Sequence, residues 1–464
     1  MHLLRLLAWA IVSAFAASAD DFRNVMYIDE WHPTIPNNGT ITNLITHVIM
    51  AFVDPLNFTT PNYAMVAPPL MSVDEVRAHF DNDTKIGIAL GGWGAFSSSF
   101  SLAAAPQNRS SFSCNLASWM DEKGYDFVDI DWEYPGGHGA QEPSNATADI
   151  ENFPMLLSEI RKALKPEKFI SLAASGTLVG MDAFKTGKME AIYGPVDFIT
   201  VMSYDYVNRV SQKTGHHTDV EGSKVAVQRY LDLGVPPGKL NLGFAFYAKY
   251  FQVMDGCTNF TTPDSCEIVP AQDANGVDNY KSGVLTFEPN NLDPQPVPAS
   301  LIGSVNGVCG IQKNTQTGLK CPASYCCSQD GWCGDSTAHC LPSCQRGYGR
   351  CDGPDDVTSF KRARENFQYD ATKGGLYYFD NMTTPMLFWT WENTDMMIRK
   401  FDEIVNNPDH KLGGISAWSL GENSFGWNHV LQMQNMTRIR NAANSTEGGG
   451  EGEGEGGACE DILE

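Results

Sequence analysis

Three acidic side chains recur at every second residue, at Asp129, Asp131 and Glu133. Side chains alternate along a strand, so these three would share one face while the apolar residues between them share the other. With a rise of about 3.3 Å per residue, successive carboxyls lie roughly 6.6 Å apart. At an effective dielectric of ~20, two charges at that distance repel by about 2.5 kcal/mol. The row therefore retains one or more protons near neutral pH, which suits a general acid.

The alternative is a solvent-facing strand that carries its acids on the outside. Asp is a poor strand former, so three acids on one strand favour a functional reason. The row also ends a strand and is followed by the turn residues 134–137, Tyr-Pro-Gly-Gly. Active sites of β/α barrels lie at this carboxyl end of the strands, so we favour function.

Eight strand-like apolar segments alternate with helical patterns along the chain. The strands are expected at Asn24–Ile28, Thr46–Phe52, Lys85–Leu90, Phe127–Asp131, Phe169–Ala174, Phe198–Ser203, Leu240–Phe246 and Gly414–Trp418. Helices are expected at Met71–Phe80, Phe112–Glu122, Phe153–Leu164, Ser223–Leu233 and Asp395–Val405. The alternation predicts an α/β fold with a parallel sheet, and eight strands close a TIM barrel. An open doubly wound sheet competes, but no Gly-rich dinucleotide fingerprint follows the first strand.

The interval from Phe246 to Gly414 is too long for one connection, so an insertion between the seventh and eighth strands is expected. We divide the chain into a signal peptide (1–19), the first part of the barrel with the start of the insertion (20–302) and a cysteine-rich module (303–353). The end of the insertion and the last strand (354–444) follow, and then a Gly/Glu tail (445–464) whose composition predicts disorder.

The N-terminus has a basic residue, a short apolar run and an Ala-Ser-Ala site, which predicts a secretory signal peptide cut after Ala19. A membrane anchor is the alternative, but the run falls short of the ~20 residues that a span needs. Nine N-x-S/T sequons agree with export, at Asn38, Asn57, Asn82, Asn108, Asn145, Asn259, Asn381, Asn435 and Asn444. A net charge of −23 argues against a nucleic-acid partner, whereas a neutral polysaccharide would not be repelled.

The stretch from Asp126 to Glu133 resembles the DxxDxDxE signature of glycoside hydrolase family 18, the chitinases and their lectin relatives. The resemblance extends along most of the chain: residues 89–93 resemble that family's third strand, 202–205 its sixth, 243–247 its seventh and 413–418 its eighth. Ala89 stands where that family usually has Ser, and Phe127 where it commonly has Gly. Neither change touches a proton-transfer group, although Phe127 adds bulk inside the barrel.

This resemblance implies a mechanism in which Glu133 protonates the glycosidic oxygen and the N-acetyl oxygen of the substrate is the nucleophile. Asp131 would hold the acetamido N–H, and Asp129 would share its proton. Tyr204 would hydrogen-bond the acetamido oxygen with help from Asp205. The expected lining of the groove is aromatic or apolar: Trp418, Trp93, Met202, Tyr27, Phe52 and Tyr247.

Eight of the twelve cysteines lie between Cys309 and Cys351. So short a stretch cannot fold on an apolar core alone, so four bridges are expected, with zinc a weaker alternative because C-x2-C pairs are absent. The spacing resembles the hevein-like chitin-binding module, which implies the pairs Cys309–Cys327, Cys321–Cys333, Cys326–Cys340 and Cys344–Cys351. The same resemblance implies a sugar face with Ser328 and Trp332, where Asp330 and His339 replace aromatics. Cys257 is expected to bridge Cys266, leaving Cys114 and Cys459.

Two classes of function follow from the resemblance. A hydrolase would cut chitin, whereas a lectin would bind chitin fragments without cutting; an endo-β-N-acetylglucosaminidase is a third option on the same fold. Lectin relatives usually lack the acid, and Glu133 is present, so hydrolysis is favoured. The expected partners are chitin and chito-oligosaccharides, with no nucleic acid and no membrane, and the chain is expected to be a secreted monomer. No cofactor and no metal site are expected.

Overall fold

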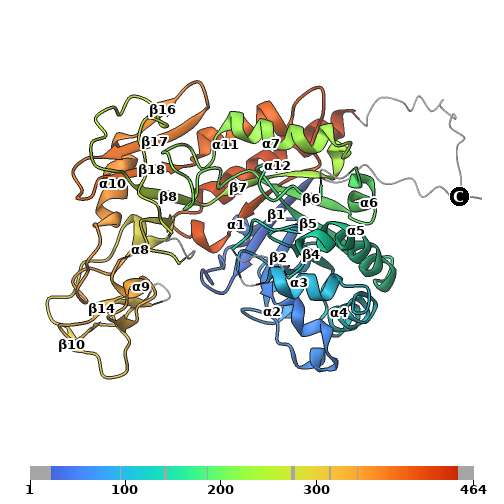
Figure 1. The fold of residues 1–464 in the computed structure, drawn as a ribbon, viewed down its shortest axis with the longest axis horizontal. Helices are drawn as coiled ribbons and strands as arrows, with labels where there is room; N and C mark the ends of the chain where they lie inside the picture. The colour runs from blue at the N-terminus through green and yellow to red at the C-terminus, as the bar shows by residue number, and fades with distance from the viewer. Residues whose placement is uncertain are drawn as a thin grey trace, which may run out of the picture.

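The computed structural model describes residues 22–447 except 95, 141–143, 185–186, 273–276, 313–314 and 342. The expected signal peptide and residues 448–464 of the expected Gly/Glu tail lie outside the described residues, whereas residues 445–447, which we also assigned to that disordered tail, end a helix. At the centre is a closed barrel of eight parallel strands in the order β1-β19-β7-β6-β5-β4-β3-β2 (Figure 1). The strands are β1 Arg23–Asp29, β2 His47–Val53, β3 Lys85–Gly91, β4 Phe127–Asp131, β5 Phe169–Ser175, β6 Phe198–Met202, β7 Leu240–Ala245 and β19 Gly414–Trp418. The predicted TIM barrel is confirmed.

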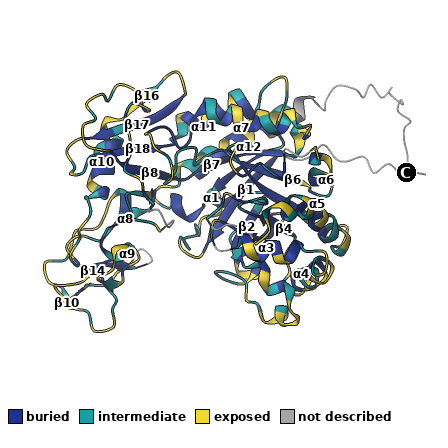
Figure 2. Ribbon diagram, in the orientation of Figure 1, coloured by how far each residue is buried: buried dark blue, intermediate teal, exposed yellow. Residues whose placement is uncertain are grey.

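Helices surround the barrel as an outer layer. They are α1 Gly39–Thr42, α2 Val73–Arg77, α3 Ser97–Ala104, α4 Arg109–Lys123, α5 Ala146–Ala163, α6 Met189–Tyr193, α7 Val220–Asp232, α11 Thr394–Lys400 and α12 Asn428–Glu447. Shorter helical turns are η1 Pro55–Thr59, η2 Pro61–Met65, η3 Pro237–Lys239 and η5 Gly421–Asn423, and the π-helix η4 Phe401–Val405 continues α11. Side-chain caps from Asn145 and Asp219 begin α5 and α7. The apolar faces of these helices and strands form the largest core, and most of the barrel strands are dark blue, for buried, in Figure 2.

The barrel interior has a smaller apolar core of its own. Phe127 points into it from β4, together with Phe198 from β6 and Val25 from β1. In the register of β3 and β4, Phe127 lies opposite Gly87, and a Cβ at Gly87 would come within 2.4 Å of the Phe127 ring. The bulk that Phe127 brings is therefore accommodated by the absence of a side chain on the neighbouring strand.

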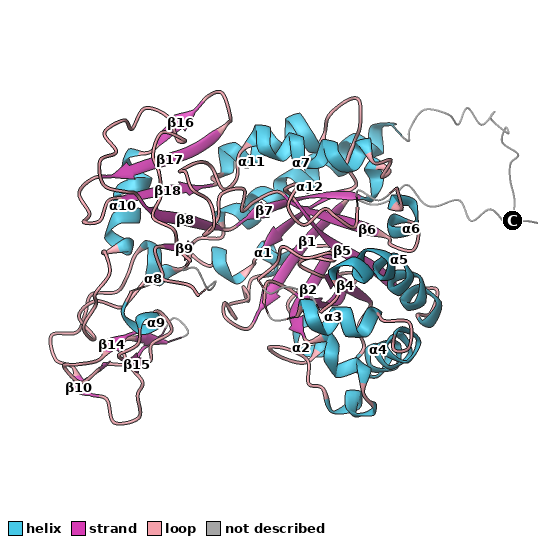
Figure 3. Cartoon of the chain, in the orientation of Figure 1, coloured by secondary structure: helices cyan, strands magenta, loops and turns pink. Residues whose placement is uncertain are grey.

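A second sheet fills much of the predicted insertion. It is antiparallel, in the order β16-β17-β18-β8-β9, and lies beside the barrel (Figure 3). Its strands are β8 Tyr247–Gln252, β9 Ser282–Thr286, β16 Gln368–Asp370, β17 Gly375–Asp380 and β18 Leu387–Trp391, and it packs with α8 Pro289–Leu292 and α10 Asp356–Asn366. The sequence predicted an insertion but not this sheet. The predicted seventh strand ends one residue earlier than expected, at Ala245, and Tyr247, the last residue of the stretch that resembles the family's seventh strand, begins β8.

The cysteine-rich segment forms a lobe of short strands below the inserted sheet (Figure 1). It contains β10 Ile302–Gly303, β11 Ile311–Gln312, β12 Thr315–Gln316, β13 Leu319–Lys320, β14 Cys326–Cys327, β15 Cys333–Gly334 and α9 Thr337–Cys340. Its disulfides are Cys309–Cys327, Cys321–Cys333, Cys326–Cys340 and Cys344–Cys351, the pairs that the hevein-like resemblance implies. A further disulfide joins Cys257 to Cys266 in the insertion. Cys114 is a free, exposed thiol, and Cys459 lies outside the described residues.

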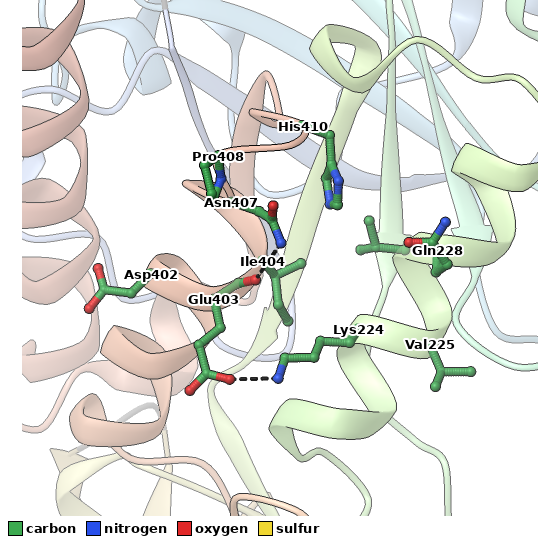
Figure 4. A pocket seen from close by; sticks show the side chains of 10 residues that line it. Lys224, Val225, Gln228, Asp402, Glu403, Ile404, Asn407, Pro408 and His410 are labelled. Atoms are coloured by element: carbon green, nitrogen blue, oxygen red, sulfur yellow. Dashed lines mark hydrogen bonds and ion pairs between the residues drawn. The ribbon is translucent and has the colours of Figure 1, made fainter.

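Two features of the outer surface complete the architecture. No helix in the described part of the chain is long and apolar enough to cross a membrane. A groove of about 580 Å³ runs between α7 and η4, where the Lys224 ammonium pairs with Glu403 at 2.6 Å (Figure 4). None of the residues that line this groove belongs to the acidic row, so the chemistry must be sought at the strand ends.

Candidate active site

The acidic row lies at the carboxyl end of β4. Asp129 and Asp131 are in the strand, and Glu133 follows two residues after its end. Two hydrogen bonds hold the backbone where the chain leaves β4. The Gly92 N–H donates to the Asp131 carbonyl at 2.8 Å, and the Ser97 hydroxyl donates to the Glu133 carbonyl at 2.9 Å. A Cβ at Gly139 would lie 1.8 Å from that Glu133 carbonyl, so the following loop requires glycine there.

Asp129 is the deepest member of the row and is fully buried. Its carboxylate accepts hydrogen bonds from the Tyr27 hydroxyl at 2.8 Å and the Ser171 hydroxyl at 2.6 Å. Burial raises the pKa of Asp129 to about 6 although both hydrogen bonds favour the ionised form. Tyr27, expected as a groove residue, thus belongs to the support of the acidic row.

Asp131 and Glu133 titrate under mutual influence. Burial, followed by the charges of Glu133 and Asp129, raises the pKa of Asp131 well above its usual range. Burial raises the pKa of Glu133 to about 7, against a hydrogen bond from the Tyr134 hydroxyl and with a contribution from Asp205. Within the described part of the chain, Asp131 Oδ1 is buried without a hydrogen-bond partner. The row therefore holds protons near neutral pH and presents an unsatisfied acceptor.

Asp205 faces the acidic row from the loop after β6. Its surroundings lower its pKa, whereas those of the row raise the pKa values of its members. Its carboxylate receives the Tyr247 hydroxyl at 2.8 Å and lies 2.7 Å from the Lys249 ammonium and 3.5 Å from His217 Nδ1. Burial would raise the pKa of Asp205, but Lys249 and His217 hold it below its usual value. Burial also lowers the pKa of His217 to about 4, so that ring is neutral. An ionised carboxylate therefore opposes a row that retains protons near neutral pH.

Aromatic side chains line the opening above these acids. The Trp418 ring stacks on Phe52, with centroids 5.3 Å apart, and lies 5.5 Å from the Tyr27 ring. The Tyr204 and Tyr247 rings meet edge to face at 6.1 Å. The half-buried Met202 ends β6 beside Tyr204.

Trp93 stands apart from that cluster at the rim. It is 52% exposed and contacts Tyr134 at a centroid distance of 6.5 Å. The Arg209 guanidinium lies 5.9 Å over the Trp93 ring. An exposed tryptophan beside the acid is available to stack on a sugar face.

Sequence reasoning missed several residues of this site. Lys249 and His217 come from the second sheet and from the loop before α7, where nothing in the sequence links them to Asp205. Trp31 is 61% exposed and its ring lies 6.4 Å from Phe52. Its position two residues after the first strand was a usable signal, because the carboxyl ends of all eight strands meet at one face.

The two module residues of the predicted site, Ser328 and Trp332, lie in the cysteine-rich lobe and not among these acids. Trp332 is half-exposed, whereas Ser328 is buried and its hydroxyl accepts the Trp332 N–H at 3.2 Å. The His339 imidazole, which is partly exposed, hydrogen-bonds with the Ser336 hydroxyl at 2.7 Å. The lobe therefore has a surface separate from the carboxylate centre.

A β/α barrel with paired acids at the carboxyl ends of its strands and an aromatic opening is an arrangement of glycoside-cleaving proteins. The family model of the glycosyl hydrolases family 18 matches residues 23–423. The chain belongs to this family.

Curated relatives agree with that assignment. The chain is 27% identical to a probable chitinase 2 of Drosophila melanogaster over 53% of its own length and 54% of that protein. It is 28% identical to chitotriosidase-1 of Mus musculus over 47% of its length and 50% of that protein. The chain thus spans about half the length of the curated relatives it matches.

Solved structures show the same fold. A group IV chitinase of Ostrinia furnacalis in complex with allosamidin superposes with a TM-score of 0.57 at 19% identity, over 91% of this chain and 99% of that one. A class V chitinase from Nicotiana tobaccum gives a TM-score of 0.58 at 16% identity, over 90% and 99%. At these identities the likeness concerns architecture alone.

Proposed function

We propose that this protein is a chitinase that hydrolyses β-1,4 N-acetylglucosamine linkages with retention of configuration, using the acetamido group of the substrate as nucleophile. The observation that carries the proposal is the contrast between Glu133, whose pKa is raised, and Asp205, whose pKa is lowered. Glu133 has a pKa of about 7, while Asp205 is kept ionised by Lys249. A proton donor and a fixed negative charge at one barrel mouth are what a glycoside requires for departure of the leaving group. The names of the matched relatives support chitin as the substrate.

The first step would transfer the Glu133 proton to the glycosidic oxygen as the C1–O bond breaks. The acetamido oxygen of the same sugar attacks C1 and forms a cyclic oxazolinium ion. Asp131 Oδ1, which is buried without a partner among the described residues, would accept the acetamido N–H and stabilise that cation. Asp129 would share its proton with Asp131, while Tyr204 and Asp205 orient the acetamido group. Water, deprotonated by Glu133, then opens the ring, and two inversions at C1 give retention.

Proton NMR of freshly formed products tests this proposal. Incubation with chitin oligomers of several lengths should release products whose β-anomer is initially in excess. An initial excess of the α-anomer would exclude substrate assistance. Tight binding of the oligomers without any product would instead identify a lectin, and release of glycans from N-glycoproteins in preference to chitin cleavage would identify an endo-β-N-acetylglucosaminidase.

We further propose that the protein is secreted and glycosylated and acts as a monomer. Five disulfides are typical of an oxidising compartment. The sequon asparagines Asn38, Asn82, Asn145, Asn259, Asn381 and Asn435 are exposed, and Asn57 and Asn108 are partly exposed. The side chain of Asn444 is outside the described set. A mass shift on deglycosylation of protein collected from culture medium, with size-exclusion chromatography, tests these points.

A further inference from the structure

A buried ionic cluster that the proposed mechanism does not use lies beside the aromatic opening. The His32 imidazole is at its centre: Nδ1 lies 3.0 Å from Asp29 Oδ1 and 3.7 Å from Glu422 Oε1, and Nε2 lies 3.8 Å from Glu288 Oε2. The side chains of Asp29 and Glu422 are 0% and 4% exposed. Three acidic side chains around one largely buried imidazole favour its protonated form.

The members of this cluster come from three separate elements. Asp29 ends β1, Glu422 lies in η5 directly after β19, and Glu288 precedes α8 in the insertion. The Thr286 hydroxyl also donates to Glu288 at 2.7 Å. His32 therefore joins two strand ends of the barrel to the inserted sheet.

The same cluster fixes the two segments that present the groove tryptophans. The Asp29 carboxylate accepts the Trp31 N–H at 3.0 Å and the His32 N–H at 2.8 Å, which shapes the turn carrying Trp31. On the other segment it accepts the Ser419 hydroxyl at 2.6 Å, and Glu422 accepts the Ser419 N–H at 3.0 Å. Ser419 directly follows Trp418, so one carboxylate–imidazole unit determines the spacing of both tryptophans around Phe52.

We propose that His32 is a positioning residue that, as an imidazolium, sets the aromatic surface of Trp31, Phe52 and Trp418, so that affinity for long chito-oligosaccharides depends on its protonation. This inference rests on the proposed function, since it assumes that the groove binds chitin oligomers. Short oligomers occupy fewer of these rings and depend less on the spacing.

The charges give the direction of the pH effect. Burial opposes protonation, but Asp29, Glu422 and Glu288 raise the pKa of His32 to about 9. Burial raises the pKa of Glu422 to about 8. The stabilisation from protonated His32 is fully present below its usual pKa of about 6.5 and is lost as pH rises through about 9, and Glu422 keeps its proton below about 8, so the cluster loses its favourable charge balance as pH rises through about 8 to 9. Above that range His32 loses its charge while Glu422 gains one beside Asp29.

Binding measured in a Glu133→Gln background tests the inference, because that change prevents turnover of the oligomers and removes one titrating acid from the groove, while the comparison of two oligomer lengths controls for the acids that remain. The dissociation constant of the hexamer should rise about threefold to tenfold between pH 7 and pH 10, and that of the dimer should change less. Adding His32→Gln should weaken hexamer binding already at pH 7 and flatten the alkaline rise. The matched control is His216→Gln, which breaks another buried histidine–aspartate pair, His216–Asp370, in contact with the inserted sheet. It should leave the pH profile unchanged.

An alkaline rise that persists with His32→Gln, or an identical profile for dimer and hexamer, would overturn the inference. If the His32 variant does not fold, the pH dependence of the parent variant for the two oligomers decides by itself. If no oligomer binds at any pH, the proposed function has failed. Crystal structures of the unmodified protein at pH 7 and pH 10 then judge the cluster separately: displaced Trp31 and Trp418 at pH 10 support it, and unmoved rings refute it.

Discussion

The barrel mouth and the cysteine-rich lobe are held together by different forces. The mouth buries Asp129 and Asp131 and partly buries Glu133 against a large apolar core, so their desolvation can be offset by many packed side chains. The lobe has a core made mostly of its own half-cystines with Tyr348. Its four disulfides stabilise it instead by reducing the conformational entropy of the unfolded chain. Groups with strongly raised pKa values therefore occur where apolar packing is abundant. The lobe presents surface chemistry, centred on the exposed Trp332.

The largest effect is expected from Glu133→Gln, which changes the barrel mouth and leaves the lobe untouched. The change is nearly isosteric and keeps the fold, but it removes the proton donor and should reduce kcat on chitin oligomers about 10²- to 10⁴-fold. Oligomer affinity should survive. Steady-state kinetics with calorimetric binding checks both, and turnover close to that of the unchanged protein would remove Glu133 from the role of acid.

The pH profile is the next largest effect. Glu133 must be protonated to donate, and burial raises its pKa to about 7, so kcat should fall as pH rises through about 7, by about tenfold per unit beyond it. This loss should affect oligomers of every length, unlike the effect inferred for His32. Kinetics from pH 5 to 9 measure it, and a kcat that is constant up to pH 9 would contradict the assignment.

Lys249→Met tests the role of Asp205, the carboxylate that faces the acidic row and pairs with Lys249. The Lys249 ammonium lies 2.7 Å from the Asp205 carboxylate, so its removal should raise the pKa of Asp205 and leave the Asp205 side chain less firmly held. We therefore expect kcat/KM to fall about tenfold to a hundredfold. The matched control is Lys224→Met, which breaks the partly exposed Lys224–Glu403 pair drawn in Figure 4 and should leave kcat/KM unchanged. Equal losses in the two variants would show that general destabilisation is responsible.

The smallest effect is expected from the lobe. Replacing residues 307–353 by a short Gly/Ser linker should leave cleavage of soluble oligomers within about twofold and lower adsorption to insoluble chitin modestly, because Trp332 is the one ring on the expected sugar face. A pull-down with chitin powder and an oligomer assay measure the two. Complete loss of adsorption would show that the lobe is the main anchor.

Local sequence patterns determined the barrel and the centre of its site. Short apolar segments between helical patterns are a property of the local sequence, so all eight barrel strands were predicted within one residue of their observed ends. The same period placed Asp129, Asp131 and Glu133 on one inward face. A motif that lies within one strand carries its own geometry.

Tertiary structure alone decided which distant residues complete that site. Lys249 reaches Asp205 from the inserted sheet and His217 reaches it from the loop before α7, and His32 meets Glu422 only because β1 and β19 close the barrel as neighbours. The inserted sheet itself was missed, since its strands pair across the cysteine-rich lobe. The pKa values follow the same division, because burial is their largest cause and burial is a property of the whole packed chain.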